Sequence, residues 1–311
     1  MIYTEEYIIA KTVNEAIEAY TKNTDAAYIA GGTDIMVNRY QENETSKCLI
    51  DISFIEELKG INPVGNYLRI GPLEKLEDLG KNKDLQSSFP FLIEAALAVG
   101  SPLIRKTATI GGNILCENRC LFYNQSEWWR KAVGYCLKCN GDICIATGGK
   151  NACFSEMVSD TAPALIALDA EVEFINQKET KRFKLTDLYS GDGVQPLTID
   201  KSFLLTGIYI PLNRKFKGVF KKLRIRESLD FTSLSSAVSI DENNQIIIAL
   251  SGVDPKPVVV YGKLSDDKEK LIKTAIKQAR AVDNDMLSRK YRKEMINVFI
   301  NKSFEELNIK L

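Results

Sequence analysis

The sequence predicts an α+β protein of two or three domains, and three observations lead to that prediction. The chain has 311 residues, which is more than one hydrophobic core usually organises. Helix and strand signals alternate in the first half, whereas short strand-like runs dominate from about residue 185. Two helix-like segments, near 265–282 and 284–306, then end the chain. Strands followed by helices are typical of α+β domains.

The first helix is expected over residues 12–22, because Thr12 stands at its start and Glu15 follows three residues later, as in a capping box. A second is expected to open at Pro90 and to close at Gly100. The segment 159–175, "SDTAPALIALDAEVEFI", is typical of a capped helix that leads into a strand. Strands are predicted in "AAYIAGG", "KCLIDIS", "YLRIGP", "FLLTGIYIP", "GVFKKLRIR", "SLSSAVSI" and "QIIIALSGV".

Charge and composition exclude several classes of protein. Lysine plus arginine equals aspartate plus glutamate at 41 each, so the basic field of a nucleic-acid-binding protein is absent. The N-terminus does not resemble a signal peptide, and no apolar run approaches 18 residues, so we expect a cytoplasmic protein without a membrane span. The sequence contains no histidine, which excludes Ser-His-Asp and Cys-His catalysis.

Two paired-glycine turns each follow a strand-like run: "AGGTD" at 30–34 and "ATIGGN" at 108–113. Glycine allows the backbone to approach a ligand closely, and successive N–H groups can then converge on phosphate. Neither turn matches the Rossmann or the P-loop pattern, so a nucleotide bound here requires another fold. A single Gly-Gly pair is usually a plain turn.

Cysteines are concentrated in one part of the chain. Residues 120–144 hold four of the seven cysteines and both tryptophans. Cytoplasmic thiols stay reduced, so clustered cysteines indicate metal ligands or redox groups rather than disulfides. The polar, glycine-dotted segment 114–155 is too long for an unsupported loop, which favours a metal that fixes it. By ligand type alone a Cys₄ zinc site and an iron–sulfur cluster fit equally.

Taken together, "AGGTDIMV", "VGSPLIRKTATIGGNI" and "SDTAPALIALDAEVE" resemble the FAD-binding subunit of the molybdenum hydroxylases, the family of xanthine oxidase, carbon monoxide dehydrogenase and 4-hydroxybenzoyl-CoA reductase. The resemblance covers essentially the whole chain. It implies a two-lobed FAD-binding domain of the vanillyl-alcohol oxidase/PCMH type and a C-terminal α+β domain of the CO dehydrogenase flavoprotein type. The implied boundaries are 1–58 and 59–180 for the lobes and 185–311 for the C-terminal domain.

The same resemblance implies which residues bind FAD. Asp160 would hydrogen-bond the cofactor, while a helix N-cap is its structural alternative. Lys222 would lie next to the flavin, with a solvated strand lysine as the alternative, and Leu205 would pack near the isoalloxazine. The residues of the two turns would line the two sides of the cofactor: Ala30, Gly31, Gly32, Thr33 and Asp34 on one, and Val99, Gly100, Thr109, Ile110, Gly111, Gly112 and Asn113 on the other.

Residues 114–155 resemble the insert of the 4-hydroxybenzoyl-CoA reductase β subunit, which binds a [4Fe–4S] cluster. The matching ligands are Cys120, Cys136, Cys144 and Cys153. Cys116 and Cys139 are spare thiols, either of which could replace one of these ligands, and Cys136 with Cys139 forms a C-x-x-C pair that is also a zinc or redox signature.

The resemblance implies an electron-transfer subunit without catalytic residues of its own. Its partners would be a molybdopterin-binding large subunit, a small subunit with two [2Fe–2S] centres, and a ferredoxin-like donor or NAD(H). In the reductase, electrons would enter through the cluster and FAD and remove a phenolic hydroxyl at the large subunit. The alternatives are an oxidative hydroxylase subunit that delivers electrons to NAD⁺ and a zinc-pinned nucleotide-binding or scaffold protein. The organic substrate is not readable from this chain.

Overall fold

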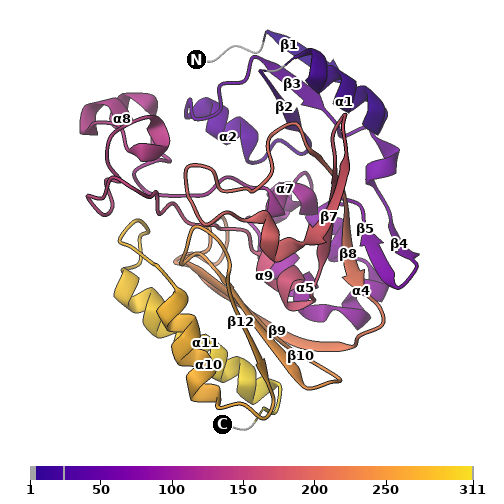
Figure 1. Cartoon of the computed structure of the whole chain (residues 1–311), viewed down its shortest axis with the longest axis vertical. Coiled ribbons are helices and arrows are strands. Elements are labelled where there is room, and N and C mark those ends of the chain that lie inside the picture. Colours follow the sequence, from indigo (N-terminus) through magenta and orange to yellow (C-terminus); the bar gives the residue numbers. More distant parts are fainter. Residues whose placement is uncertain (1–4, 24, 310–311) are drawn as a thin grey trace.

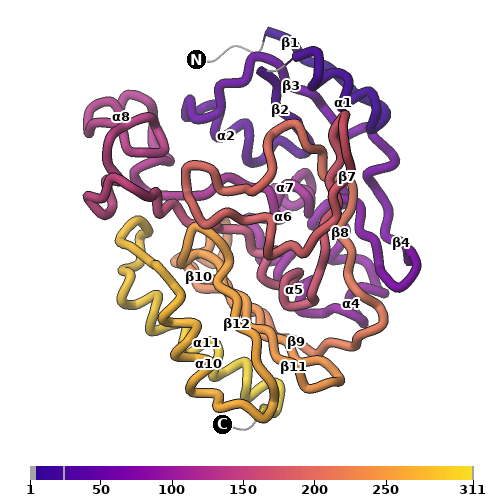
Figure 2. The backbone as a smooth tube through the Cα atoms, viewed as in Figure 1, coloured from indigo at the N-terminus to yellow at the C-terminus, as the bar shows by residue number. Residues whose placement is uncertain are grey.

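The computed structural model describes residues 5–23 and 25–309, and it arranges them around three β-sheets (Figure 1). The sheets follow one another along the length of the molecule, and the cysteine-rich segment projects from one side, as the backbone trace in Figure 2 shows. Within the described residues, none of the helices has both the length and the apolar character that crossing a membrane requires.

The first sheet is parallel, with strand order β1-β3-β2, and it forms the N-terminal end of the molecule. Its elements are β1 (Glu6–Ile9), α1 (Val13–Lys22), β2 (Ala26–Ile29), α2 (Ile35–Tyr40) and β3 (Cys48–Asp51). The predicted cap of α1 is confirmed, because the Thr12 hydroxyl accepts a hydrogen bond from the backbone N–H of Glu15. The Glu15 carboxylate accepts from the backbone N–H of Lys11, one residue before the position a capping box requires.

The middle sheet is antiparallel, with order β4-β5-β8-β6-β7. Its strands are β4 (Ile61–Val64), β5 (Tyr67–Ile70), β6 (Glu171–Ile175), β7 (Thr180–Lys184) and β8 (Leu204–Pro211). Helices between its strands are α3 (Leu76–Leu79), α4 (Lys83–Ser88), α5 (Pro90–Leu97), α6 (Pro102–Arg105), α7 (Ile110–Ile114), α8 (Glu127–Val133) and α9 (Thr161–Ala167), with 3₁₀ turns at Leu137–Cys139 and Leu185–Leu188. A further 3₁₀ turn, Glu56–Leu58, precedes β4. Strand β8, which the sequence analysis placed with the C-terminal segment, therefore pairs in this sheet.

The third sheet is an antiparallel meander, with order β12-β11-β10-β9, built from β9 (Phe216–Leu223), β10 (Leu234–Asp241), β11 (Gln245–Ser251) and β12 (Val258–Lys263). Two helices, α10 (Lys268–Gln278) and α11 (Arg289–Glu306), cover one face of it (Figure 1). Strand-rich sequence followed by two helices thus gives the α+β arrangement that was predicted. Strand β12 was not predicted.

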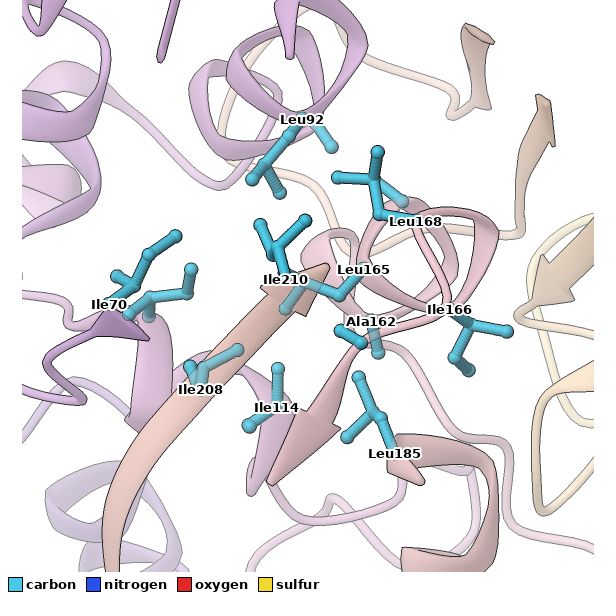
Figure 3. Packing of buried hydrophobic residues seen from close by; sticks show 14 of the residues in the cluster. Ile70, Leu92, Ile114, Ala162, Leu165, Ile166, Leu168, Leu185, Ile208 and Ile210 are labelled. Carbon is cyan, nitrogen blue, oxygen red and sulfur yellow. The ribbon is translucent and has the colours of Figure 1, made fainter. Parts of the chain in front are cut away.

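The main hydrophobic core lies between the middle sheet and the third sheet, around α9. All seven residues of α9 are buried, and the helix packs on β10 and β11 as well as on α5 and α7. Figure 3 shows Leu165 of this helix and Leu168, its C-cap, packing near Ile208 and Ile210 of β8. The core therefore fixes the position of α9 relative to the glycine turns and to the third sheet.

Helix α5 begins at Pro90 as predicted, but its last residue is Leu97, whereas a helix closed by Gly100 would continue to Val99. Ala98 is the C-cap, and Gly100 follows with a φ of +50°, a left-handed conformation that favours glycine. Helix α8, inside the cysteine-rich segment, was not predicted. Ser126 caps it, and its C-cap is Gly134.

Candidate functional site

The two paired-glycine turns, which lie far apart in the sequence, pack directly against each other. A Cβ atom added to Gly31 would lie 1.9 Å from the backbone oxygen of Thr107 and 3.2 Å from the nitrogen of Ala108. Only glycine permits this approach, because any side chain at residue 31 would overlap the second turn. The turns 30–34 and 108–113 therefore form one composite backbone surface.

The remaining glycines of these turns serve different purposes. Gly32 has a φ of +72°, so it requires the conformational freedom of glycine. Gly111 lies against Pro72, where a Cβ would come within 2.7 Å of the ring. Gly112 is exposed, and a Cβ there would meet only the Thr109 hydroxyl, at 3.0 Å. The Thr109 hydroxyl accepts a hydrogen bond from the Gly112 N–H (3.0 Å) and so caps α7.

Asn113 attaches the second turn to α9. Its side-chain oxygen accepts hydrogen bonds from the Ser159 hydroxyl (2.8 Å), the Thr161 hydroxyl (2.6 Å) and the Thr161 N–H (3.1 Å). Ile110, next to the paired glycines, is fully buried in the main core. The turn is thus held from both sides by the core, which gives it a fixed geometry.

A buried ion pair joins α9 to the third sheet at the same place. The Lys222 ammonium on β9 lies 2.6 Å from the Asp160 carboxylate, and both side chains are only 5% exposed. The Ser235 hydroxyl donates to the other oxygen of Asp160 at 2.6 Å. Burial raises the pKa of Asp160, while the Lys222 ammonium and the Ser235 hydroxyl act against that rise. Lys222 is therefore not a solvated strand lysine.

The alternative role considered for Asp160, an N-cap, is wrong in its side-chain detail. Asp160 occupies the N-cap position of α9, but its backbone is helical and its carboxylate makes no cap hydrogen bond. The Ser159 hydroxyl instead accepts from the Ala162 N–H at 3.0 Å. The carboxylate is directed to Lys222, so its position is set by charge pairing.

Val99 and Gly100 lie close to this ion pair. Lys222 also donates to the backbone oxygen of Ala98 (3.0 Å), and the Leu229 N–H donates to the Gly100 oxygen (3.1 Å). The loop that follows β9 therefore packs beside the segment that leads to the second turn. It also presents an exposed Phe231.

Asp34 connects the first turn to the cysteine-rich segment. Its carboxylate accepts from the Glu117 N–H at 3.0 Å and pairs with the guanidinium of Arg119. Arg119 precedes Cys120, so this ion pair sets the start of the segment relative to the first turn. Thr33, beside Asp34, is exposed, and Ala30 is half-buried against the N-terminal core.

The four predicted cysteine ligands surround a single small cavity. Cys120, Cys136, Cys144 and Cys153 all line it, and three of these residues are buried. Cys116 and Cys139 do not line it. In residues 5–23 and 25–309, however, no group of three or more Cys, Asp or Glu side chains converges closely enough to hold one metal ion. The thiols thus face a common space without meeting at a point.

The thiols differ in their acidity. A hydrogen bond with the Cys139 thiol lowers the pKa of Cys136 to about 6, whereas burial raises the pKa values of Cys120 and Cys153. Burial likewise raises the pKa of Cys116, which lies outside the cavity. Burial therefore disfavours the thiolate form of Cys120 and Cys153 unless a cation lies nearby.

Several residues around this cavity were missed by the sequence analysis. Lys138 lines it with an ammonium group on a side chain that is only 4% exposed. Gly193 closes over Cys153, where a Cβ would lie 2.7 Å from the sulfur. The buried Arg130 guanidinium donates to the Gln41 oxygen (2.7 Å) and so holds the segment against α2. Lysine and arginine at such spacing carry no ligand signature, so no sequence signal indicated them.

One other predicted residue lies away from solvent. Leu205, on β8, is 3% exposed within the main core and pairs in register with Phe174, and its place near the isoalloxazine stays a prediction. Cys48 is buried in β3, as a strand cysteine of the N-terminal core.

Comparison with known proteins defines the class, a flavoprotein subunit of oxidoreductases. The sequence profile described as "FAD binding domain in molybdopterin dehydrogenase" matches residues 3–213. The chain therefore belongs to this family, the FAD-binding subunits of molybdenum-containing dehydrogenases and hydroxylases. No catalytic residue for an organic substrate was assigned to it from sequence.

Relatives and solved structures agree with that membership. The chain is 30% identical over 266 residues to the "Aldehyde oxidoreductase FAD-binding subunit PaoB" of Escherichia coli, covering 81% of this chain and 82% of the relative. It is 27% identical to the "Nicotinate dehydrogenase FAD-subunit" of Eubacterium barkeri, covering 76% and 69%. Its fold matches the CO dehydrogenase of Oligotropha carboxidovorans with a TM-score of 0.76 at 21% identity, over 98% of both chains. The predicted fold, with an FAD-binding domain of the PCMH type and a CO dehydrogenase-like C-terminal part, is confirmed.

Proposed function

We propose that this chain is the FAD- and [4Fe–4S]-containing electron-transfer subunit of a molybdopterin-dependent reductase or dehydroxylase that acts on a hydroxylated aromatic, similar to 4-hydroxybenzoyl-CoA reductase. The single observation that carries the proposal is the cavity lined by Cys120, Cys136, Cys144 and Cys153. The cysteine-rich segment that forms it is held to the first glycine turn by a hydrogen bond to Asp34. Its partners would be a molybdopterin-binding large subunit and a small [2Fe–2S] subunit.

The residues present fit FAD. The composite surface of the two turns includes the exposed Gly112, which has no side chain of its own to keep a ligand away from the backbone. The residues of the two turns, from Ala30 to Asp34 and from Thr109 to Asn113, would hold the pyrophosphate and ribityl chain. Lys222 and Asp160 would stand beside the flavin, because their buried pair adjoins the Val99–Gly100 segment. When bound, FAD supplies both two-electron and one-electron redox chemistry.

The choice of a polynuclear centre over a single ion rests on the resemblance of residues 114–155 to the insert of the reductase β subunit, because four cysteines around one cavity suit both kinds of centre. A tetrahedral zinc with Zn–S bonds of about 2.3 Å would draw its four thiolates to within about 3.8 Å of one another. The four thiols share one cavity. A cubane cluster, which takes four cysteine ligands and passes single electrons, keeps its ligands farther apart. The buried surroundings would exclude water, and the positive charge of the iron ions would hold the thiolates.

Metal analysis tests this proposal directly. Iron, acid-labile sulfide and zinc should be measured on the full-length chain purified without oxygen. We expect iron and sulfide in equal amounts, and zinc near zero. One zinc per chain without sulfide would contradict the cluster, while leaving the FAD-binding family membership intact.

A second candidate function rests on the relatives. Those that cover most of the chain are named aldehyde oxidoreductase, nicotinate dehydrogenase and xanthine dehydrogenase subunits, so an oxidative role with NAD⁺ as acceptor is the alternative. Stopped-flow reduction of the complete complex separates the two functions. Rapid flavin reduction by a reduced ferredoxin and a slow response to NADH supports the reductase, and the reverse order supports the alternative.

A further inference from the structure

The buried ammonium of Lys138 has no role in the FAD site or among the cysteine ligands. It lines the four-cysteine cavity, its side chain is 4% exposed, and it lies 4.9 Å from the centre of the Tyr123 ring. Removing a lysine ammonium from water is costly unless charge partners replace the lost hydration. Its position beside the ligands therefore calls for a physical reason.

The partners of Lys138 connect the two cofactor sites. Its ammonium lies 2.5 Å from the Glu117 carboxylate and donates to the backbone oxygen of Gly193. It also lies 3.5 Å from the Ser155 hydroxyl, which itself lies 3.5 Å from the Cys153 sulfur. The backbone N–H of Glu117 in turn donates to Asp34 of the first glycine turn. A chain of polar contacts thus runs from the glycine turn to the cavity, with Lys138 at its inner end.

The charge of this pair is unevenly exposed. The Glu117 side chain is 34% exposed, whereas Lys138 is almost completely buried. Water screens the carboxylate more than the ammonium, so the carboxylate offsets only part of the positive potential that Lys138 places in the cavity. Four thiolates in the same cavity would supply the remaining negative charge.

We propose that Lys138 is a positioning and tuning residue whose buried positive charge raises the reduction potential of the cysteine-bound centre. The inference rests on the proposed function, because it requires a redox-active centre in the cavity. One-electron reduction adds one negative charge there, and a nearby fixed cation stabilises the reduced form. Net charge around the cluster and hydrogen bonds near its sulfurs are recognised means of setting such potentials.

Potentiometric titration of the full-length chain, followed by EPR, tests the proposal. Lys138→Met removes the cation and should lower the midpoint potential, whereas Lys138→Arg should stay near the wild-type value. Glu117→Gln removes the partly neutralising carboxylate and should raise the potential. Lys131→Met is the matched control, since Lys131 is an exposed lysine of the same segment, and it should cause no shift.

Opposite shifts in the Met and Gln variants support the proposal. If Lys138 only stabilises the fold, its variants should change iron content or stability and leave the reduction potential of the remaining centre unchanged. That result would overturn the inference. If Lys138→Met retains no iron, Glu117→Gln decides, and a potential at or below wild type refutes the proposal. Wild-type protein without iron and sulfide would instead overturn the proposed function itself, so the two failures are distinguishable.

Discussion

Replacing Gly31 with alanine should force the two glycine turns apart and weaken FAD binding. The added Cβ would lie 1.9 Å from the Thr107 oxygen, and a comfortable carbon–oxygen contact is about 3.3–3.6 Å, so the turns must separate by about 1.5 Å. Overpacking of this kind costs about 1–3 kcal/mol. A free-energy cost of about 1.4 kcal/mol corresponds to a tenfold loss of affinity. If the whole packing cost is taken from the free energy of FAD binding, the affinity for FAD falls by about 5- to 150-fold.

The assay is a titration of flavin-stripped protein with FAD, followed by flavin fluorescence, together with urea unfolding of the stripped protein. Gly149→Ala is the matched control, because its Cβ would meet only the Thr147 hydroxyl at 3.4 Å. Gly112→Ala should leave the stripped protein nearly as stable as wild type and weaken FAD binding alone. Unchanged stability and FAD affinity in Gly31→Ala would refute the conclusion that the turns must touch.

Three further variants test the ion pairs and the ligands. Lys222→Met leaves the buried carboxylate of Asp160 without its cation and should lower the free energy of unfolding by about 3–5 kcal/mol in urea titrations. When Asp160 is also replaced by an apolar residue, most of this stability should return. A double variant as unstable as Lys222→Met would argue against the pair. Cys144→Ser should lose most of its iron, because Cys144 lines the cavity. Cys48→Ser is the control and should keep its iron, because Cys48 lies in the N-terminal core. Equal iron content in the two variants would exclude Cys144 as a ligand. The Arg292 guanidinium pairs with the Glu156 carboxylate in the interior, where both side chains are almost completely buried. Arg292→Met removes this partner and should cost about 1–3 kcal/mol, measured as a lower urea midpoint, because burial raises the pKa of Glu156 to about 8 and its carboxyl can take up a proton. A wild-type midpoint would show that the pair adds nothing to stability.

Local signals in the sequence were sufficient for individual elements. Thr12 and Pro90 mark the starts of two helices because capping and ring geometry act over a single turn. Helix α8 escaped prediction, because seven residues in a polar segment give little periodic signal. Strand β12 also escaped; it lies at the edge of its sheet and its second half is largely exposed, so its apolar pattern is incomplete. The pairing of β8 in the middle sheet depends on long-range strand contacts that its own residues do not encode.

The composite site could be predicted only in part. The paired glycines were visible as motifs, but the contact between Gly31 and Thr107 arises from tertiary packing. Lys138 and Gly193 carry no motif, and they reach the cysteine cavity only because distant segments fold together. The four cysteines of the cavity were proposed as ligands through a family resemblance, and that role stays a prediction; residue type and spacing alone left zinc and iron–sulfur open.

The central claim is that one chain holds a flavin and a thiolate-bound four-iron centre side by side. The most direct test is the visible and EPR spectrum of the full-length, oxygen-protected protein before and after reduction with dithionite. We predict flavin absorption before reduction and, after it, the EPR signal of a reduced four-iron cluster in proportion to the bound FAD. A flavin spectrum with no iron signal and one zinc per chain would contradict the claim.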